Sequence, residues 1–210
     1  MRCFVAIDID DGLRGRIDKL QREFKKRLKN PAGIKWVEPK LIHLTLKFLG
    51  EIEDAAADQI AQTLESACAG HKGFDIEFSA VGSFGRPPKV LWLGTEKENA
   101  ELEKLVQDIE QAFENLGFEK EQRPFSPHLT LARVKERRPD RQLIEVIGGF
   151  GKIDAQSVKA DSVCFYKSQL TPHFQNIHKI GQRESAGLTS AGPVYTLLKK
   201  INLKIREEGK

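Results

Sequence analysis

Two segments of the chain share a short pattern in which a histidine is followed, two residues later, by a threonine. Residues 43–46 read His-Leu-Thr-Leu, and residues 128–131 repeat the same four letters. Polar and apolar residues alternate in both segments, which is the period of a half-buried β-strand. Since successive side chains of a strand point to opposite faces, each segment should present its His and Thr on one face and its two leucines on the other.

Histidine is suited to proton transfer near neutral pH, because the unperturbed pKa of imidazole is about 6.5. His43 and His128 can therefore act as an acid–base pair, one taking a proton from an attacking water and the other protonating a leaving oxygen. The hydroxyls of Thr45 and Thr130 can donate hydrogen bonds to phosphate oxygens. These four residues predict in-line attack on a phosphodiester, and a strained 2′,3′-cyclic phosphate suits such a site without a metal ion.

Three residues near these segments raise questions of side-chain direction. Arg133 could clamp a phosphate or stack on a base, but strict alternation places it on the face opposite His128. Its role therefore requires the strand to end or to bulge before Arg133. In the first segment, alternation predicts Phe48 in the core with the leucines, and Lys47 on the face of His43, either lining the site or in solvent.

Composition indicates an ordinary globular protein. The chain has 210 residues, of which 40% are apolar and 30% charged, and its net charge of +4 permits an anionic substrate without demanding one. The sequence has no long uncharged apolar run, so we expect no membrane helix. An acidic residue, Asp8, follows the N-terminus too closely for a signal peptide. The three distant cysteines, Cys3, Cys68 and Cys164, indicate a reducing cytoplasmic location rather than a disulfide framework.

The expected elements occur twice in the same order: strand, helix, strand with the histidine, helix, strand. We expect an α+β fold, a single bilobal domain whose two pseudo-symmetric lobes cover about residues 1–85 and 86–170. The two His/Thr faces would then lie opposite each other. An insertion loop and a C-terminal edge strand, blunted by lysines, are expected within residues 171–210.

The paired His-x-Thr-Leu segments, in two similar halves, resemble the two-histidine (2H) phosphoesterases. Within this group the chain is most similar to the bacterial and archaeal RNA 2′,3′-cyclic phosphodiesterases, also called 2′-5′ RNA ligases. The stretches that carry the resemblance are residues 2–8, 43–51, 127–133 and 165–172, the last resumed at 192–196. Residues 174–186 depart from the family pattern, which leaves the substrate range open.

The resemblance implies hydrolysis of RNA 2′,3′-cyclic phosphate ends to 2′-phosphomonoesters without a cofactor or metal, together with a weak, reversible 2′-5′ ligation of RNA ends. The fold that it implies is a bilobal α+β fold with mainly antiparallel sheets facing a central cleft. It implies His43 as proton donor and His128 as proton acceptor, with phosphate bound by Thr45 and Thr130 and substrate by Arg133. The implied partner is RNA with a cyclic phosphate end, tRNA fragments being one example. We expect a cytoplasmic monomer.

Two other functions remain open. The site could hold RNA ends without turnover, although a binding module would favour Arg and Lys over a histidine pair. Alternatively, the same chemistry could act on a small nucleotide such as ADP-ribose cyclic phosphate. The loop at residues 82–89, which contains Arg86, is interpreted as a Pro- and Gly-bearing connector between lobes rather than as an RNA contact.

Overall fold

The computed structural model describes residues 1–28, 33–135, 141–170 and 192–205. The helices are α1 (Asp11–Arg27), α2 (Ala57–Cys68), α3 (Ala100–Asn115) and α4 (Arg141–Phe150), with short 3-10 turns η1 (Pro39–Leu41) and η2 (Asp54–Ala56). The strands are β1 (Arg2–Asp8), β2 (Ile34–Trp36), β3 (His43–Glu51), β4 (Phe74–Phe84), β5 (Val90–Gly94), β6 (His128–Val134), β7 (Lys152–Ala160), β8 (Ser162–Leu170) and β9 (Pro193–Asn202).

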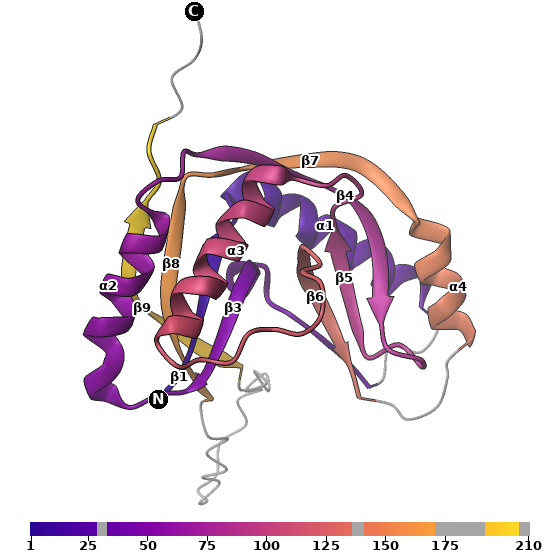
Figure 1. Cartoon of the computed structure of the whole chain (residues 1–210). Helices are drawn as coiled ribbons and strands as arrows, with labels where there is room; N and C mark the ends of the chain where they lie inside the picture. The colour runs from indigo at the N-terminus through magenta and orange to yellow at the C-terminus, as the bar shows by residue number, and fades with distance from the viewer. Residues whose placement is uncertain (29–32, 136–140, 171–191, 206–210) are drawn as a thin grey trace, which may run out of the picture.

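The strands of the described residues form one nine-stranded sheet. Its order is β7-β4-β5-β6-β3-β1-β8-β9, with β2 beside β6, and the pairs between these strands are antiparallel. Helices cover the strands at both ends of the sheet (Figure 1). The expected α+β class with a mainly antiparallel sheet is confirmed.

The two sequence repeats are interleaved in space. Although β4 belongs to the first repeat, it pairs with β5 and β7 of the second, whereas β8 of the second repeat pairs with β1 of the first. We call β3, β1, β8 and β9, with α2 and α3, the His43 side; β2, β6, β5, β4 and β7, with α1 and α4, form the His128 side. The repeats at residues 1–85 and 86–170 are therefore not the two spatial sides of the sheet (Figure 1).

Helix and strand leucines share one hydrophobic core. Each helix buries residues three or four apart, as Leu13, Ile17, Leu20 and Phe24 of α1 illustrate, and this stripe packs on the leucine face of the strands. Leu44 and Leu129 are almost completely buried there. Burying one such side chain stabilises the fold by roughly 1.5–3 kcal/mol. The leucine face thus fixes the sheet against the helices and leaves the opposite face for other residues.

The C-terminal part of the described chain forms an edge. β9 pairs with β8 and is the last strand of the sheet, as expected for an edge strand. The predicted insertion loop lies outside the described residues, apart from its last positions. All three cysteines are buried and free. In the part of the chain that the structure describes, no helix is long and apolar enough to cross a membrane.

Candidate active site

The two His/Thr segments meet where β3 and β6 pair. Leu44 of β3 lies opposite Leu129 of β6, so His43 and Thr45, which flank the first leucine, lie beside this contact together with His128 and Thr130, which flank the second. Both leucines are buried, whereas the histidines and threonines are half-buried. The structure therefore brings the four predicted residues together on the face of the sheet opposite the core, which we call the site face.

Both histidine rings are held in the same way. Nδ1 of His43 lies 2.9 Å from the carbonyl oxygen of Leu41, and Nδ1 of His128 lies 2.8 Å from that of Ser126. A carbonyl oxygen only accepts hydrogen bonds, so each Nδ1 carries the hydrogen and donates it. In the neutral rings this leaves both Nε2 atoms as unprotonated acceptors, available for proton transfer.

The pKa values of the two histidines are shifted by partly different neighbours. Burial lowers the pKa of both, against the opposing effect of the carbonyl that each ring bonds. The charge of Arg133 lowers both pKa values further, so this arginine lies within electrostatic reach of both rings. Among the described residues, only Asp8 is a carboxylate that raises the pKa of either ring, and it acts on His43. The two histidines therefore differ in their charged neighbours.

Asp8 is a site residue that the sequence did not single out. It lies opposite His43 on β1, whereas the corresponding neighbour of His128 on β5 is Gly94. The Tyr166 hydroxyl donates a hydrogen bond of 2.8 Å to Oδ2 of Asp8. Burial, together with this bond, raises the pKa of Tyr166, so it remains a donor that holds the carboxylate in place.

Arg133 reaches the site face through a β-bulge. The register between β5 and β6 passes from the pair Leu91–Ala132 to the pair Trp92–Thr130 and skips Leu131. One extra residue reverses the alternation beyond it, so Arg133 is exposed on the same face as His128. The strand thus bulges before Arg133, as a role for this arginine beside His128 requires.

A second bulge, at the equivalent place in β3, overturns two expectations. The register with β1 skips Leu46, three residues after His43, as Leu131 is three residues after His128. Phe48 was predicted in the core, but it is 69% exposed and lies on the site face. Lys47 was predicted on the face of His43, but it is only 5% exposed and lies on the helix side. Both predictions were wrong because the bulge reverses the alternation after Leu46.

Buried polar groups from two helices hold these bulges. On α1, Gln21 is 2% exposed, and its Nε2 donates hydrogen bonds to the carbonyl oxygens of Val37 (2.8 Å) and Leu131 (3.0 Å). On α3, Glu110 accepts a hydrogen bond of 2.6 Å from Nζ of Lys47. No pattern in the sequence indicated either role, since a polar residue in an amphipathic helix is usually solvated.

Aromatic rings surround His43. Its ring stacks on Phe4 at a centroid distance of 4.7 Å and meets Tyr195 edge-on at 5.3 Å. Phe4 also lies 6.4 Å from Phe48 and 5.4 Å from Tyr166. Because these rings exclude water from one side of the imidazole, they account for the burial that lowers its pKa.

A smaller aromatic group lies beside His128. Phe84 meets the His128 ring edge-on at 4.8 Å and lies 5.4 Å from Trp92. Trp92 is paired with Gly82 on one side and Thr130 on the other. A Cβ added to Gly82 would come within 2.4 Å of the Trp92 ring, so glycine leaves the space that this indole fills.

The comparison with protein families decides the identity. A model of the 2′-5′ RNA ligase superfamily matches residues 9–172. The chain belongs to this superfamily. Among its relatives in the superfamily, the RNA 2′,3′-cyclic phosphodiesterase of Methanothermobacter thermautotrophicus is 31% identical over 205 residues, covering 97% of this chain and 99% of the relative. The protein of the same name from Methanocaldococcus jannaschii is 31% identical over 202 residues, covering 95% and 99%.

Solved structures of similar proteins share the fold. A protein of Thermus thermophilus has a TM-score of 0.73 at 23% identity, covering 99% of this chain and all of its own. Escherichia coli LigT, solved with 3′-AMP, has a TM-score of 0.72 at 22% identity, covering 96% and 97%. At these identities the likeness concerns the architecture of the superfamily.

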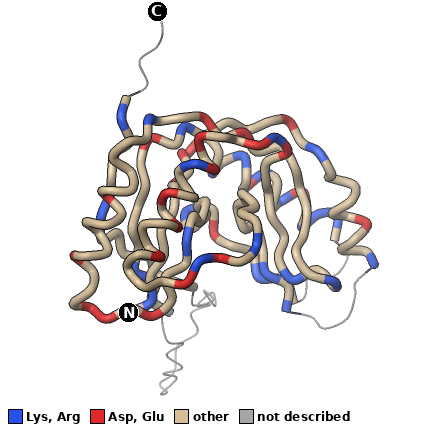
Figure 2. Tube along the Cα trace, in the orientation of Figure 1, with Lys and Arg blue, Asp and Glu red and all other residues tan. Residues whose placement is uncertain are grey.

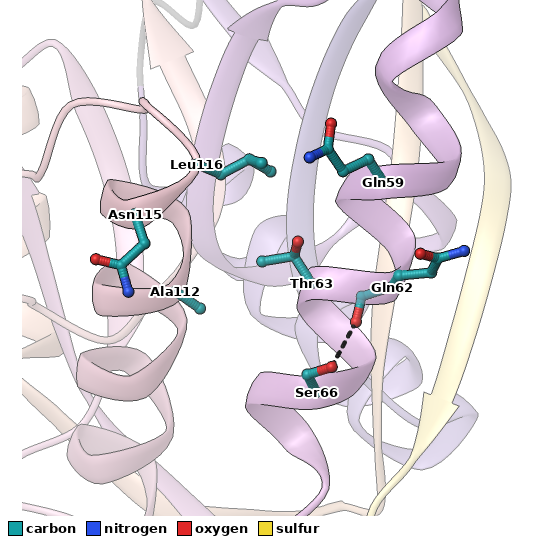
Figure 3. A pocket seen from close by; sticks show the side chains of 7 residues that line it. All are labelled: Gln59, Gln62, Thr63, Ser66, Ala112, Asn115 and Leu116. Atoms are coloured by element: carbon teal, nitrogen blue, oxygen red, sulfur yellow. Dashed lines mark hydrogen bonds between the residues drawn. The ribbon is translucent and has the colours of Figure 1, made fainter.

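Outside the site face, the described part of this superfamily member has fewer side chains that could take part in a reaction. A groove of about 480 Å³ lies between α2 and α3, away from the histidines, and neutral side chains line it, among them Gln59, Thr63 and Asn115 (Figure 3). Within the described residues, no group of three or more His, Cys, Asp or Glu side chains is arranged to hold a metal ion.

Proposed function

We propose that this protein hydrolyses RNA 2′,3′-cyclic phosphate ends to 2′-phosphomonoesters. The observation that carries the proposal is the placement of two imidazoles with available Nε2 atoms on one sheet face, with Arg133 within electrostatic reach of both. Similarity to named RNA 2′,3′-cyclic phosphodiesterases along nearly the whole chain supports it.

In the proposed reaction, Nε2 of His128 accepts a proton from a water molecule, whose oxygen attacks the phosphorus atom. The bond between phosphorus and the 3′ oxygen breaks, and this oxygen leaves with the proton of His43 Nε2. Each of these proton transfers typically contributes ~10²–10⁴-fold to the rate. Thr45, Thr130 and Arg133 would hold the non-bridging oxygens. If the 5′ hydroxyl of another RNA replaces water, the same bond breaks and a 2′-5′ linkage forms.

The environment of the two rings supports this division of roles. The Asp8 carboxylate opposes the loss of a proton from His43, whereas His128 has no such neighbour within the described residues. This difference supports His43 as the proton donor and His128 as the acceptor. Beside His43, the exposed ring of Phe48 offers a surface on which a nucleobase can stack.

Product formation from a nucleoside 2′,3′-cyclic phosphate, in the presence of a chelator, tests the proposal. His43→Ala and His128→Ala should each lower kcat by ~10²–10⁴-fold. His71→Ala is the matched control, because His71 is bonded to Asp108 and belongs to neither His/Thr segment. Absence of product with the wild-type protein would contradict the proposal, as would wild-type turnover in either site variant.

The same assay separates the alternative functions. A binding module would retain RNA ends without releasing a 2′-phosphate. An enzyme for small nucleotides would turn over ADP-ribose cyclic phosphate better than an RNA end.

We propose RNA, including tRNA fragments, as the substrate. We also propose a cytoplasmic monomer as the active form, because one chain supplies both histidines and its cysteines are free.

A further inference from the structure

Basic side chains gather at one end of the His128 side. Arg133 and Lys135 are exposed at the end of β6, and Lys35 of β2 lies opposite Arg133. Lys89 and Arg86 are exposed in the connection between β4 and β5. Figure 2 shows Lys and Arg positions collected at this end of the sheet. The exposed cations of β6 and of this connection, namely Arg133, Lys135, Lys89 and Arg86, form what we call the basic strip.

The strip is continuous with the site face. Arg133 and Lys135 are two residues apart, so in an extended chain they point to the same face, about 7 Å apart. The amide of Val134 donates a hydrogen bond of 2.9 Å to the carbonyl of Lys89, which brings the β4–β5 connection beside this end of β6. Val90 pairs with Arg133, so Lys89, one residue earlier, starts on the other face and lies at the border of this strand end. A chain held at Arg133 can therefore pass directly onto Lys135, with the β4–β5 connection beside its path.

The charge of the strip is not neutralised by the described residues. Among these, no carboxylate lies within ion-pair distance of Arg86, Lys89, Arg133 or Lys135. Unpaired cations on one face favour a polyanion, because each neutralised phosphate releases a counterion.

The equivalent end of the His43 side is of mixed charge, and exposed Arg2 lies opposite Glu51 there. There β3 ends at Glu51, and Glu53 and Asp54 follow, all of them exposed. The N-terminal ammonium of Met1 lies 3.6 Å from both Glu51 and Asp54. This mixed charge attracts an RNA strand less than the basic strip does, so the difference between the two ends favours one direction for the bound strand.

We propose that the basic strip binds the RNA strand on the 5′ side of the cyclic phosphate, with successive phosphates near Arg133 and Lys135 and with Lys89 at the border of the bound strand. This inference rests on the proposed function and narrows it, since only a substrate with further nucleotides can use the strip. A mononucleotide occupies only the place beside the histidines and does not reach the strip. The β4–β5 connection, interpreted from the sequence as a connector alone, thereby contributes to substrate binding through Lys89 and Arg86.

The test compares two substrates of the wild-type protein and of the Lys89→Glu/Lys135→Glu variant. One is an oligoribonucleotide with a 2′,3′-cyclic phosphate end, and the other is the corresponding mononucleotide. The variant should raise KM for the oligonucleotide by ~10-fold or more and leave kcat/KM for the mononucleotide within about twofold. The salt dependence of binding should also weaken, by about 0.7 in the slope of log K against log salt for each phosphate that the variant no longer neutralises.

Lys19→Glu/Lys72→Glu is the matched control, because it changes net charge equally at exposed positions on α1 and after α2. It should leave both substrates unaffected. An unchanged oligonucleotide KM in the strip variant, or an equal rise in the control, would overturn the inference. Turnover of the mononucleotide shows that the variant is folded. Loss of product from both substrates in the wild-type protein would instead contradict the proposed function.

Discussion

Gln21 on α1 donates a hydrogen bond of 3.0 Å to the carbonyl of Leu131, the residue that bulges from β6. The amide of Val37 donates to the same carbonyl oxygen at 2.9 Å. The bulge is therefore tied from two directions, and it directs Arg133 to the face of His128. A helix that touches no substrate thus positions an arginine of the site.

Gln21→Met should weaken catalysis through Arg133. Methionine fills a similar volume but leaves the buried Leu131 carbonyl with one donor fewer, at a cost of about 1–3 kcal/mol in stability. A small displacement of Arg133 should lower kcat/KM by between ~10- and ~100-fold. The measurement is a double-mutant cycle with Arg133→Met, in which the effect of Gln21→Met should nearly vanish once the arginine is gone.

The cycle has its own control in the other bulge. Gln21→Met combined with Phe48→Ala should show additive effects on kcat/KM, because Phe48 follows the bulge in β3 and not that in β6. If Gln21→Met costs as much activity without Arg133 as with it, Gln21 supports the fold alone.

The Lys47–Glu110 pair should govern stability through the second bulge. Lys47→Met leaves the Glu110 carboxylate buried without its cation, with only the Glu121 amide still donating to it among the described residues, so the free energy of unfolding should fall by about 3–5 kcal/mol. Adding Glu110→Leu removes that charge and should restore most of the loss. Urea unfolding of the three variants checks this; a double variant no more stable than Lys47→Met would argue against a buried, uncompensated charge as the cause.

Much of the site could be predicted because it depends on local patterns. Alternation within the His-x-Thr-Leu segments was enough to place both histidines and both threonines on one face. Their recurrence at matching places in a repeat indicated a shared site. The buried stripes of the helices follow from residue spacing in the same way, which is why the α+β class could also be derived.

The features that the sequence did not predict depend on departures from strand alternation and on strand pairing. A β-bulge inserts one residue without any mark in the sequence, so alternation predicted the wrong face for Lys47 and Phe48. The role of Asp8 depends on which strand lies beside β1 and in what register, and strand pairing is a tertiary property. The interleaving of the repeats is tertiary as well, because residue spacing predicts elements but not their partners.

Gly82→Ala should disturb the site through Trp92. The added methyl group would lie within 2.4 Å of the indole ring, which must then shift from its place beside Phe84 and Thr130. Overpacking of this kind costs typically 1–3 kcal/mol, and we expect a lower kcat for the cyclic phosphate. Trp92→Phe in the alanine background makes room and should recover part of both losses. A tryptophan fluorescence spectrum of Gly82→Ala identical to that of the wild-type protein would count against the displacement.

The pH dependence of Asp8→Asn should identify the proton donor. Since burial lowers both histidine pKa values, the wild-type profile of kcat/KM should be bell-shaped with its maximum below pH 6.5. Activity falls at high pH as the donor loses its proton and at low pH as the acceptor gains one. Asp8, Arg133 and Tyr195 all face His43, and of these three groups only Asp8 raises the pKa of His43. Asp8→Asn should therefore shift the alkaline limb to lower pH, whereas Tyr166→Phe, which keeps the charge, should not. Movement of the acidic limb instead would make His43 the acceptor.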